Sequence, residues 1–154
     1  TIFCGVSGSP LGSDGWPDGF PADTTLDQMT KVFDDRLKQE AIETGYSVRP
    51  AGLFLPNSVS MQAATPQDET SLRQIRAKLE GLTGLYRGDV DSYVFHVSLA
   101  YLVDWLDQKS AQELVADCED LFESHLRNCN PIRFDKTEFC VFANMHHFDE
   151  VRGF

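Results

Sequence analysis

The residues of this sequence best suited to chemistry are His96 and Ser98, which interrupt an apolar stretch over residues 93–103. In a β-strand alternate side chains point to the same face, so the i, i+2 spacing places the imidazole beside the hydroxyl. An imidazole exchanges a proton near neutral pH, and a hydroxyl donates a hydrogen bond to a phosphate oxygen. The pair therefore has the composition of half of a phosphoryl-transfer site. Taken alone, a His-x-Ser pattern is weak and favours a half-buried histidine beside a hydrogen-bonded serine on a sheet surface.

The strand that must position this pair is predicted over residues 93–103, where β-branched and aromatic residues are frequent and charge is absent. Val97 and Leu99 share the opposite face, and we expect them to pack into the core. Polar side chains within such a strand need partners, water or a ligand. The pattern therefore predicts that His96 and Ser98 point into a cleft that reaches solvent.

The rest of the chain predicts alternating helices and strands. Apolar periodicity gives helices over residues 25–43, 66–85 and 110–127, and further strands over residues 47–55, 57–64 and 131–143. Thr24 or Thr25 can cap the first helix and Ser110 the last. The apolar residues of the last helix are expected to face inward: Leu114, Val115, Cys118, Leu121, Phe122 and Leu126. This mixture predicts one α+β domain over residues 1–154.

Residues 5–24 are rich in glycine, proline, serine and aspartate, which is typical of a loop. Trp16 and Phe20 lie within this segment. We expect them to pin it to the body of the protein, although a role in lining a pocket is open.

Charge limits the partners of this protein. The formal net charge is −11, which repels long nucleic acids and anionic membranes but leaves a small anionic substrate possible. No apolar run approaches the roughly 20 residues of a membrane span. We therefore expect a cytoplasmic protein that binds neither membranes nor long nucleic acid.

The cysteines predict neither a disulfide framework nor a metal site. Cys4, Cys118, Cys129 and Cys140 form no CxxC pair, and they are read as buried reduced thiols, although their even number leaves disulfides open. Cys118 and Cys129 flank His125, but a fourth ligand is not evident. No metal and no cofactor are expected.

The context of His96 resembles a known family. The stretch Tyr-Val-Phe-His-Val-Ser-Leu-Ala-Tyr-Leu over residues 93–102, followed by Trp105-Leu106, resembles the second signature of an uncharacterised branch of the two-histidine (2H) phosphoesterases. The tail over residues 139–148 is similar to the last strand of that branch, which ends in a Met-x-x-Phe turn. The opening Thr1-Ile-Phe is similar to the part of the first signature, His-x-Thr-x-Phe, that begins at its threonine. The resemblance covers nearly the whole chain and is most specific over residues 93–106.

The resemblance implies two antiparallel sheets that face a central cleft, with helices outside. It implies metal-independent hydrolysis of a 2′,3′-cyclic or similar small phosphodiester or RNA end, with one histidine as base and the other as acid. The catalytic residues would be His96, Ser98 and Thr1, and Phe3 and Tyr101 would contact substrate; a packing role for Tyr101 is equally open. The first histidine would lie two positions before Thr1, so the chain would be the C-terminal major part of the fold. A separate N-terminal fragment of the same protein, or a longer chain, would complete it.

Two further functions are open. The same fold could carry a degenerate site in a non-enzymatic ligand-binding module, or His96 could be structural in a protein-interaction domain. The other histidines predict less: His125 complements a helix C-terminus, and His146 and His147 are solvated in the final turn. The cations that could neutralise phosphate are Arg49, Arg87, Arg133 and Lys136.

Overall fold

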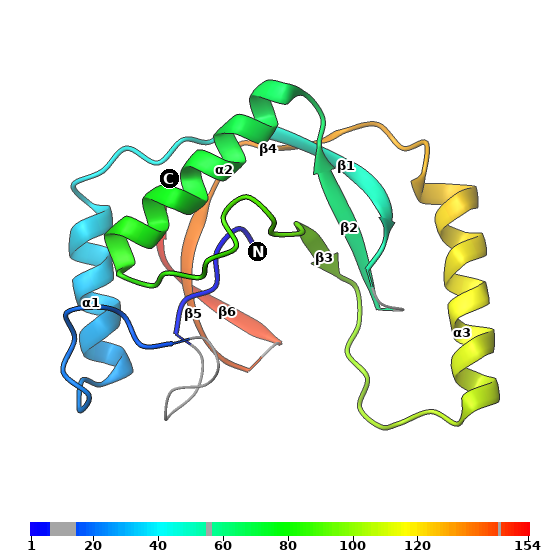
Figure 1. Cartoon of the computed structure of the whole chain (residues 1–154), viewed down its shortest axis with the longest axis horizontal. Coiled ribbons are helices and arrows are strands. Elements are labelled where there is room, and N and C mark those ends of the chain that lie inside the picture. The colour runs from blue at the N-terminus through cyan, green and yellow to red at the C-terminus, as the bar shows by residue number, and fades with distance from the viewer. Residues whose placement is uncertain (7–14, 55–56, 145) are drawn as a thin grey trace. The chain divides into compact units, whose positions relative to one another are not determined.

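The structure is a computed structural model that describes residues 1–6, 15–54, 57–144 and 146–154 (Figure 1). The chain divides into two compact units. The first unit contains Thr1, Ser47–Glu69 and Tyr93–Arg133, and the second contains Ile2–Tyr46, Thr70–Ser92 and Phe134–Phe154. Helices and antiparallel strands follow one another along the chain, which confirms the α+β class.

A four-stranded sheet carries the predicted site. Its strands are β1 (Tyr46–Leu53), β2 (Ser58–Ala63), β3 (His96–Ser98) and β4 (Ile132–Phe134), in the order β3-β2-β1-β4. β2 pairs in antiparallel fashion with both β1 and β3. β1 contains an irregularity between Pro50 and Gly52, where the register with β2 shifts.

One face of this sheet is apolar, as the alternation along β2 predicts. Val48, Val59 and Met61 are buried, and Phe95, directly before β3, is buried with them. The backbone also joins Met61 to Phe95, because the Met61 amide donates to the Phe95 carbonyl at 2.7 Å. The opposite face is left to the polar residues of the same strands.

β3 is much shorter than the predicted strand over residues 93–103. Val97 is 41% exposed and Leu99 66% exposed, so the expectation that they pack into the core is wrong. The physical reason is the position of β3 at the end of the strand order, where only β2 lies beside it among the described residues. Pairing ends at Ser98, and the amides of Leu99 and Ala100 both donate to the Asn57 carbonyl.

Helix α1 (Leu26–Leu37) builds the core of the second unit. Thr25 caps it, and Gln28 completes a reciprocal capping box, which confirms the predicted start. The helix ends at Leu37 rather than near residue 43. Met29 and Phe33 are buried with Leu85.

The loop before α1 packs against the same core. Trp16 and Phe20 contact it, and the Trp16 indole donates to the carbonyls of Phe20 and Pro21 at 3.2 Å each. This geometry confirms that Trp16 pins the loop. The part of the predicted loop over residues 7–14 lies outside the described residues.

Helix α2 (Pro66–Thr83) begins at the predicted proline. The Thr65 hydroxyl donates a hydrogen bond to the Asp68 carboxylate and accepts one from the Asp68 amide. The Asp68 carboxylate also accepts from the Ser47 amide at 2.9 Å. These bonds hold the pKa of Asp68 below its usual value. Within the first unit they attach the start of the helix to β1.

Helix α3 (Gln108–Leu121) begins two residues earlier than predicted. Its cap is Asp107, whose carboxylate accepts from the amides of Lys109 and Ser110, so the assignment of Ser110 as cap is wrong. The helix continues as a π-helical segment over Phe122–Leu126. The expected inward face is also wrong in part: Phe122 is buried, but α3 itself buries no residue, and Val115 and Leu121 are 38% and 58% exposed.

The predicted last strand over residues 131–143 is two strands. β4 ends at Phe134, and β5 (Glu138–Asn144) begins a separate two-stranded sheet with β6 (His147–Gly153), which the sequence did not predict. His147 therefore opens a strand rather than lying in a final turn. Met145 lies outside the described residues. Among the described helices, none has both the length and the apolar character needed to cross a membrane.

Candidate functional site

The register of β2 and β3 gathers polar side chains on one face of the sheet. Ser60 lies opposite His96, and Ser58 lies opposite Ser98. Residues directly opposite each other share a face and lie about 5 Å apart at Cβ. The Ser58 and Ser98 hydroxyl oxygens are 3.5 Å apart, at the limit of a hydrogen bond. Ser58 is buried, His96 is half-buried and Ser98 is exposed, so this face is open to solvent at its outer end.

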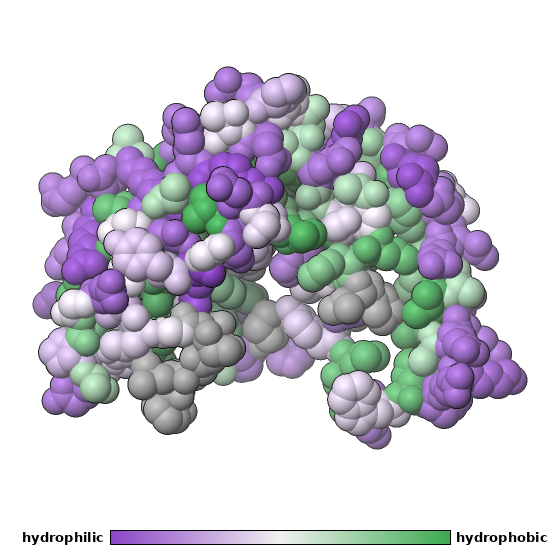
Figure 2. Space-filling view, in the orientation of Figure 1, coloured by the Kyte–Doolittle hydropathy of each residue, from purple (hydrophilic) through white to green (hydrophobic). Residues whose placement is uncertain are grey.

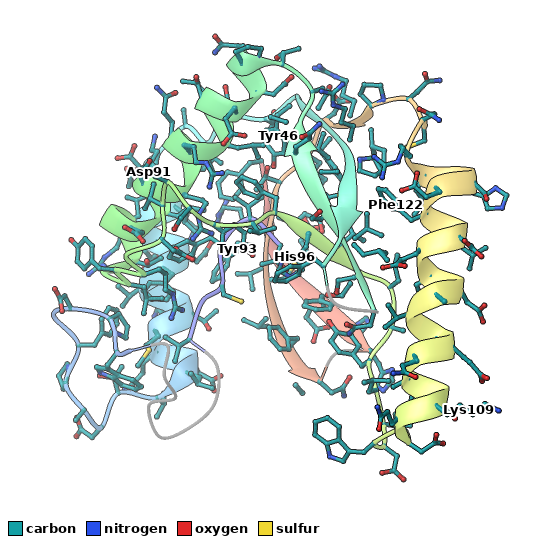
Figure 3. The ribbon with its side chains drawn as sticks, turned by 45° about the vertical axis from the view of Figure 1, so that its right-hand side comes forward. Tyr46, Asp91, Tyr93, His96, Lys109 and Phe122 are labelled. Carbon is teal, nitrogen blue, oxygen red and sulfur yellow. The ribbon has the colours of Figure 1, made fainter. Side chains whose placement is uncertain are left out.

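Two aromatic rings flank the imidazole of His96. The ring centroid of Phe54 lies 5.1 Å from that of His96, and the ring of Tyr93 lies at 6.1 Å (Figure 3). Tyr93 in turn packs edge-on against Phe95, which is buried in the core face. On the Tyr93 side, the imidazole therefore rests against a side chain that is itself anchored.

A backbone carbonyl orients the histidine. The His96 Nδ1 atom lies 3.0 Å from the carbonyl oxygen of Val94. A carbonyl only accepts hydrogen bonds, so Nδ1 carries the proton and the neutral ring keeps its lone pair on Nε2. Nε2 is therefore the atom that can accept a proton from a substrate or water, or donate one when the ring is charged.

Thr1 belongs to the same compact unit as His96. The Tyr93 hydroxyl donates to the Thr1 carbonyl at 3.4 Å, while the Tyr93 ring packs beside His96. Tyr93 thus links Thr1 to the histidine. Thr1 itself does not lie on a strand.

Among the cations predicted to neutralise phosphate, Arg49 lies on the same face of the sheet as His96 and Ser98. Arg49 lies opposite Gln62, which is two residues along β2 from Ser60. With the Gln62 amide turned so that its oxygen faces the guanidinium, that oxygen accepts from Arg49 Nε at 2.8 Å and from Nη2 at 3.1 Å. The Arg49 side chain is exposed.

Two other predicted cations have structural partners in the second unit. Arg87 donates to the carbonyls of Cys4 and Gly5 at 2.8 Å each. Lys136 pairs with Glu138 and Glu150, and these carboxylates raise its pKa. Arg133 belongs to the first unit, where its positive charge helps to lower the pKa of Asp68.

The two predicted substrate-binding residues belong to different compact units. Phe3 belongs to the second unit, where its ring lies 5.8 Å from the Arg76 guanidinium carbon and 5.9 Å from that of Arg87. This is a packing position. Tyr101 lies beyond the end of β3 and is 54% exposed.

Sequence reasoning missed Ser58, Ser60 and Phe54. The signal was present, because the apolar positions of the second predicted strand leave Ser58 and Ser60 together on its other face. What the sequence lacked was the pairing of β2 with β3, which joins this face to His96. Pairing between strands that lie far apart in the chain has no local signature.

The remaining candidates lie elsewhere. His147 Nε2 is 2.9 Å from an Asp149 carboxylate oxygen in the exposed hairpin, and His125 lies in the π-helical segment. The four cysteines are thiols rather than disulfides, but Cys4 is exposed, so the expectation that all of them are buried is wrong. Over the described ranges of the chain, histidine, cysteine and carboxylate side chains form no group of three or more that could hold a metal.

Fold and side chains together define an α+β protein with a His-x-Ser pair on an antiparallel sheet. No protein-family model matches the sequence, and no curated protein matches it significantly. Among solved structures, the chain is similar to the conserved protein of unknown function ATU0111 from Agrobacterium tumefaciens strain C58, with a TM-score of 0.79 and 28% sequence identity. The match covers 97% of this chain and 64% of the Agrobacterium protein, so the chain spans less than two thirds of that protein's length.

Proposed function

We propose that the polar face around His96 is half of a metal-independent phosphodiesterase site for a 2′,3′-cyclic or similar small phosphodiester. The observation that carries this proposal is the His96–Ser98–Ser58 arrangement: an imidazole whose Nδ1 is bound to the backbone beside two hydroxyl oxygens 3.5 Å apart. The resemblance of residues 93–106 to the 2H phosphoesterases supports the same chemistry. The facing of two sheets around a cleft stays a prediction of that resemblance.

The reaction needs one base and one acid. A water molecule attacks phosphorus as a base removes its proton; the bond from phosphorus to one ribose oxygen breaks; and an acid protonates that oxygen to give a phosphomonoester and a free hydroxyl. His96 fills one of these two roles through Nε2. The hydroxyls of Ser98 and Ser58 donate to the phosphate oxygens on which negative charge develops.

The charge of the protein restricts the substrate. A net charge of −11 disfavours a long polyanion, whereas a small phosphodiester carries a single negative charge. Arg49 on the same face can attract that charge locally, because its guanidinium is held by a neutral amide rather than by a carboxylate. A small substrate or an RNA end fits this balance better than a continuous strand.

The second histidine of the proposed site comes from polypeptide outside residues 1–154. The resemblance places it two positions before Thr1, and Thr1 is linked through Tyr93 to the side of His96. We therefore expect residues 1–154 alone to be inactive or nearly so. Protein that includes the preceding segment should be active.

The test is to incubate protein that carries the segment before Thr1 with 2′,3′-cyclic AMP and to measure both binding and formation of the nucleoside monophosphate. Turnover supports the enzyme. Binding that perturbs His96 without turnover supports the alternative, a ligand-binding module on the same fold. If neither occurs and His96 is unperturbed, the histidine is structural.

A further inference from the structure

The backbone of β3 has one edge that β2 does not use. The Met61 amide donates to the Phe95 carbonyl, and the Leu99 amide donates to the Asn57 carbonyl. In an antiparallel pair, hydrogen-bonded and non-hydrogen-bonded residues alternate along the strand. The peptide groups of His96 and Ser98 therefore point away from β2, and the strand order of the described residues ends at β3.

The segment that follows β3 exposes several large apolar side chains. Val97 on β3 and the segment after it expose apolar surface to a degree that is unusual for a folded protein. The large exposed residues include Leu99 at 66%, Leu102 at 53%, Trp105 at 92% and Leu106 at 44%. Figure 2 shows apolar side chains gathered along the segment between β3 and α3.

We infer that an extended segment from outside residues 1–154 adds to the open edge of β3 as a further strand. Strand addition satisfies the outward peptide groups of His96 and Ser98 and gives the exposed side chain of Val97 a partner. The Agrobacterium protein supports this occupant, because more than a third of its chain lies outside the matched region. A second copy of this chain is disfavoured, since it would bring two bodies with a charge of −11 together.

The geometry of strand pairing also determines which types of residue this segment needs. Its residues must alternate, because side chains of neighbouring strands share faces. One set lies on the face of Val97 and must be apolar. The other set lies on the face of His96 and Ser98, so the added strand contributes side chains directly to the candidate site.

The added strand would complete the proposed site, but its pairing with β3 does not depend on phosphodiester chemistry. Its test reads backbone protection rather than turnover, so the two proposals can fail separately. Amide hydrogen exchange is measured by NMR in residues 1–154, alone and with the part of the Agrobacterium protein that lies outside the match. We expect the amides of Val97 and Leu99 to be protected in both samples. The amides of His96 and Ser98 should exchange fast in the isolated chain and at least tenfold more slowly with the added segment.

A matched pair of variants isolates the backbone contribution. Ser98→Pro removes the outward N–H but no hydrogen bond to β2, whereas Ser98→Ala keeps the N–H and removes only the hydroxyl. Ser98→Pro should abolish complex formation in size-exclusion chromatography, and Ser98→Ala should retain it. Far-UV circular dichroism checks that both variants fold. If the Ser98→Pro variant does not fold, the hydrogen-exchange measurement on the unmodified chain alone tests whether a strand is added to β3.

Three results would overturn the inference. The first is slow exchange at His96 and Ser98 in the isolated monomer, which would show that the edge is already occupied. The second is protection that grows with the concentration of residues 1–154 alone, which would identify a second copy as the partner. The third is failure of the added segment to bind or to protect these two amides.

Discussion

The Nδ1 atom of His96 lies 3.0 Å from the carbonyl oxygen of Val94, two residues earlier in the chain. This contact fixes both the orientation and the tautomer of the imidazole without using a carboxylate. The Nε2 atom is therefore the reactive one, and the local backbone sets it in place. A histidine held in this way can act in a proton transfer while its neighbours on the sheet hold the substrate.

The tautomer can be measured directly. We expect nitrogen-15 NMR of neutral His96 to show the proton on Nδ1 and a lone pair on Nε2, because the Val94 carbonyl can only accept. A phosphate-containing ligand should then perturb Nε2 more than Nδ1. A predominantly Nε2-protonated ring would contradict the assignment of the reactive atom.

The two hydroxyls of Ser58 and Ser98 should act together. Loss of either one to alanine should lower turnover about tenfold, since each removes one hydrogen bond to the developing charge and leaves proton transfer intact. The double variant should lose less than the product of the two single effects, because the hydroxyls are neighbours. Ser60→Ala is the matched control: the Ser60 hydroxyl already donates to the Gly52 carbonyl at 3.0 Å and should matter little. An equal loss in Ser60→Ala would remove the case for the Ser58–Ser98 pair.

Chelation should leave the activity unchanged. Two histidines and two hydroxyls can supply the proton transfers and the charge stabilisation that the reaction needs. We expect equal rates before and after dialysis against EDTA. Activity that disappears with EDTA and returns with zinc or magnesium would show that the chemistry is wrongly assigned.

Acid should weaken the second unit through Asp34. Arg152 and Lys38 lower the pKa of Asp34 from 3.8 to about 2 through hydrogen bonds. A depressed pKa stabilises the folded state above the unfolded pKa, and that stabilisation is lost as pH falls from about 4 to about 2. In urea unfolding, Asp34→Asn should be less stable than the parent at neutral pH, and the difference should shrink across this window.

Asp35→Asn serves as the control for that experiment. Asp35 lies next to Asp34 on α1 and pairs with Lys38, but it is more exposed and the Arg152 pair involves Asp34. Its removal should change little, because exposed ion pairs contribute weakly. An Asp35→Asn variant with the same acid dependence as Asp34→Asn would contradict the role of Arg152.

Local sequence signals predicted the helices and the central strands. The Thr25 cap and the proline at the start of α2 identify real helix starts, and alternation along β2 identifies the apolar face. The same signals failed where pairing between strands far apart in the chain determines which side chains are buried. Val97 and Leu99 have the pattern of core residues, yet they lie exposed because β3 has one neighbour among the described strands. Ser58 joins the site only through its pairing with Ser98.

The most direct test of the central claim is hydrolysis of 2′,3′-cyclic AMP by the His96→Ala variant, in protein that includes the segment before Thr1. His147→Ala is the control, because that histidine pairs with Asp149 in an exposed hairpin. We predict a loss of about 10²–10⁴-fold for His96→Ala, near-normal activity for His147→Ala, and little or no activity from residues 1–154 alone. Full activity of residues 1–154 by themselves, or of the His96→Ala variant, would contradict the account.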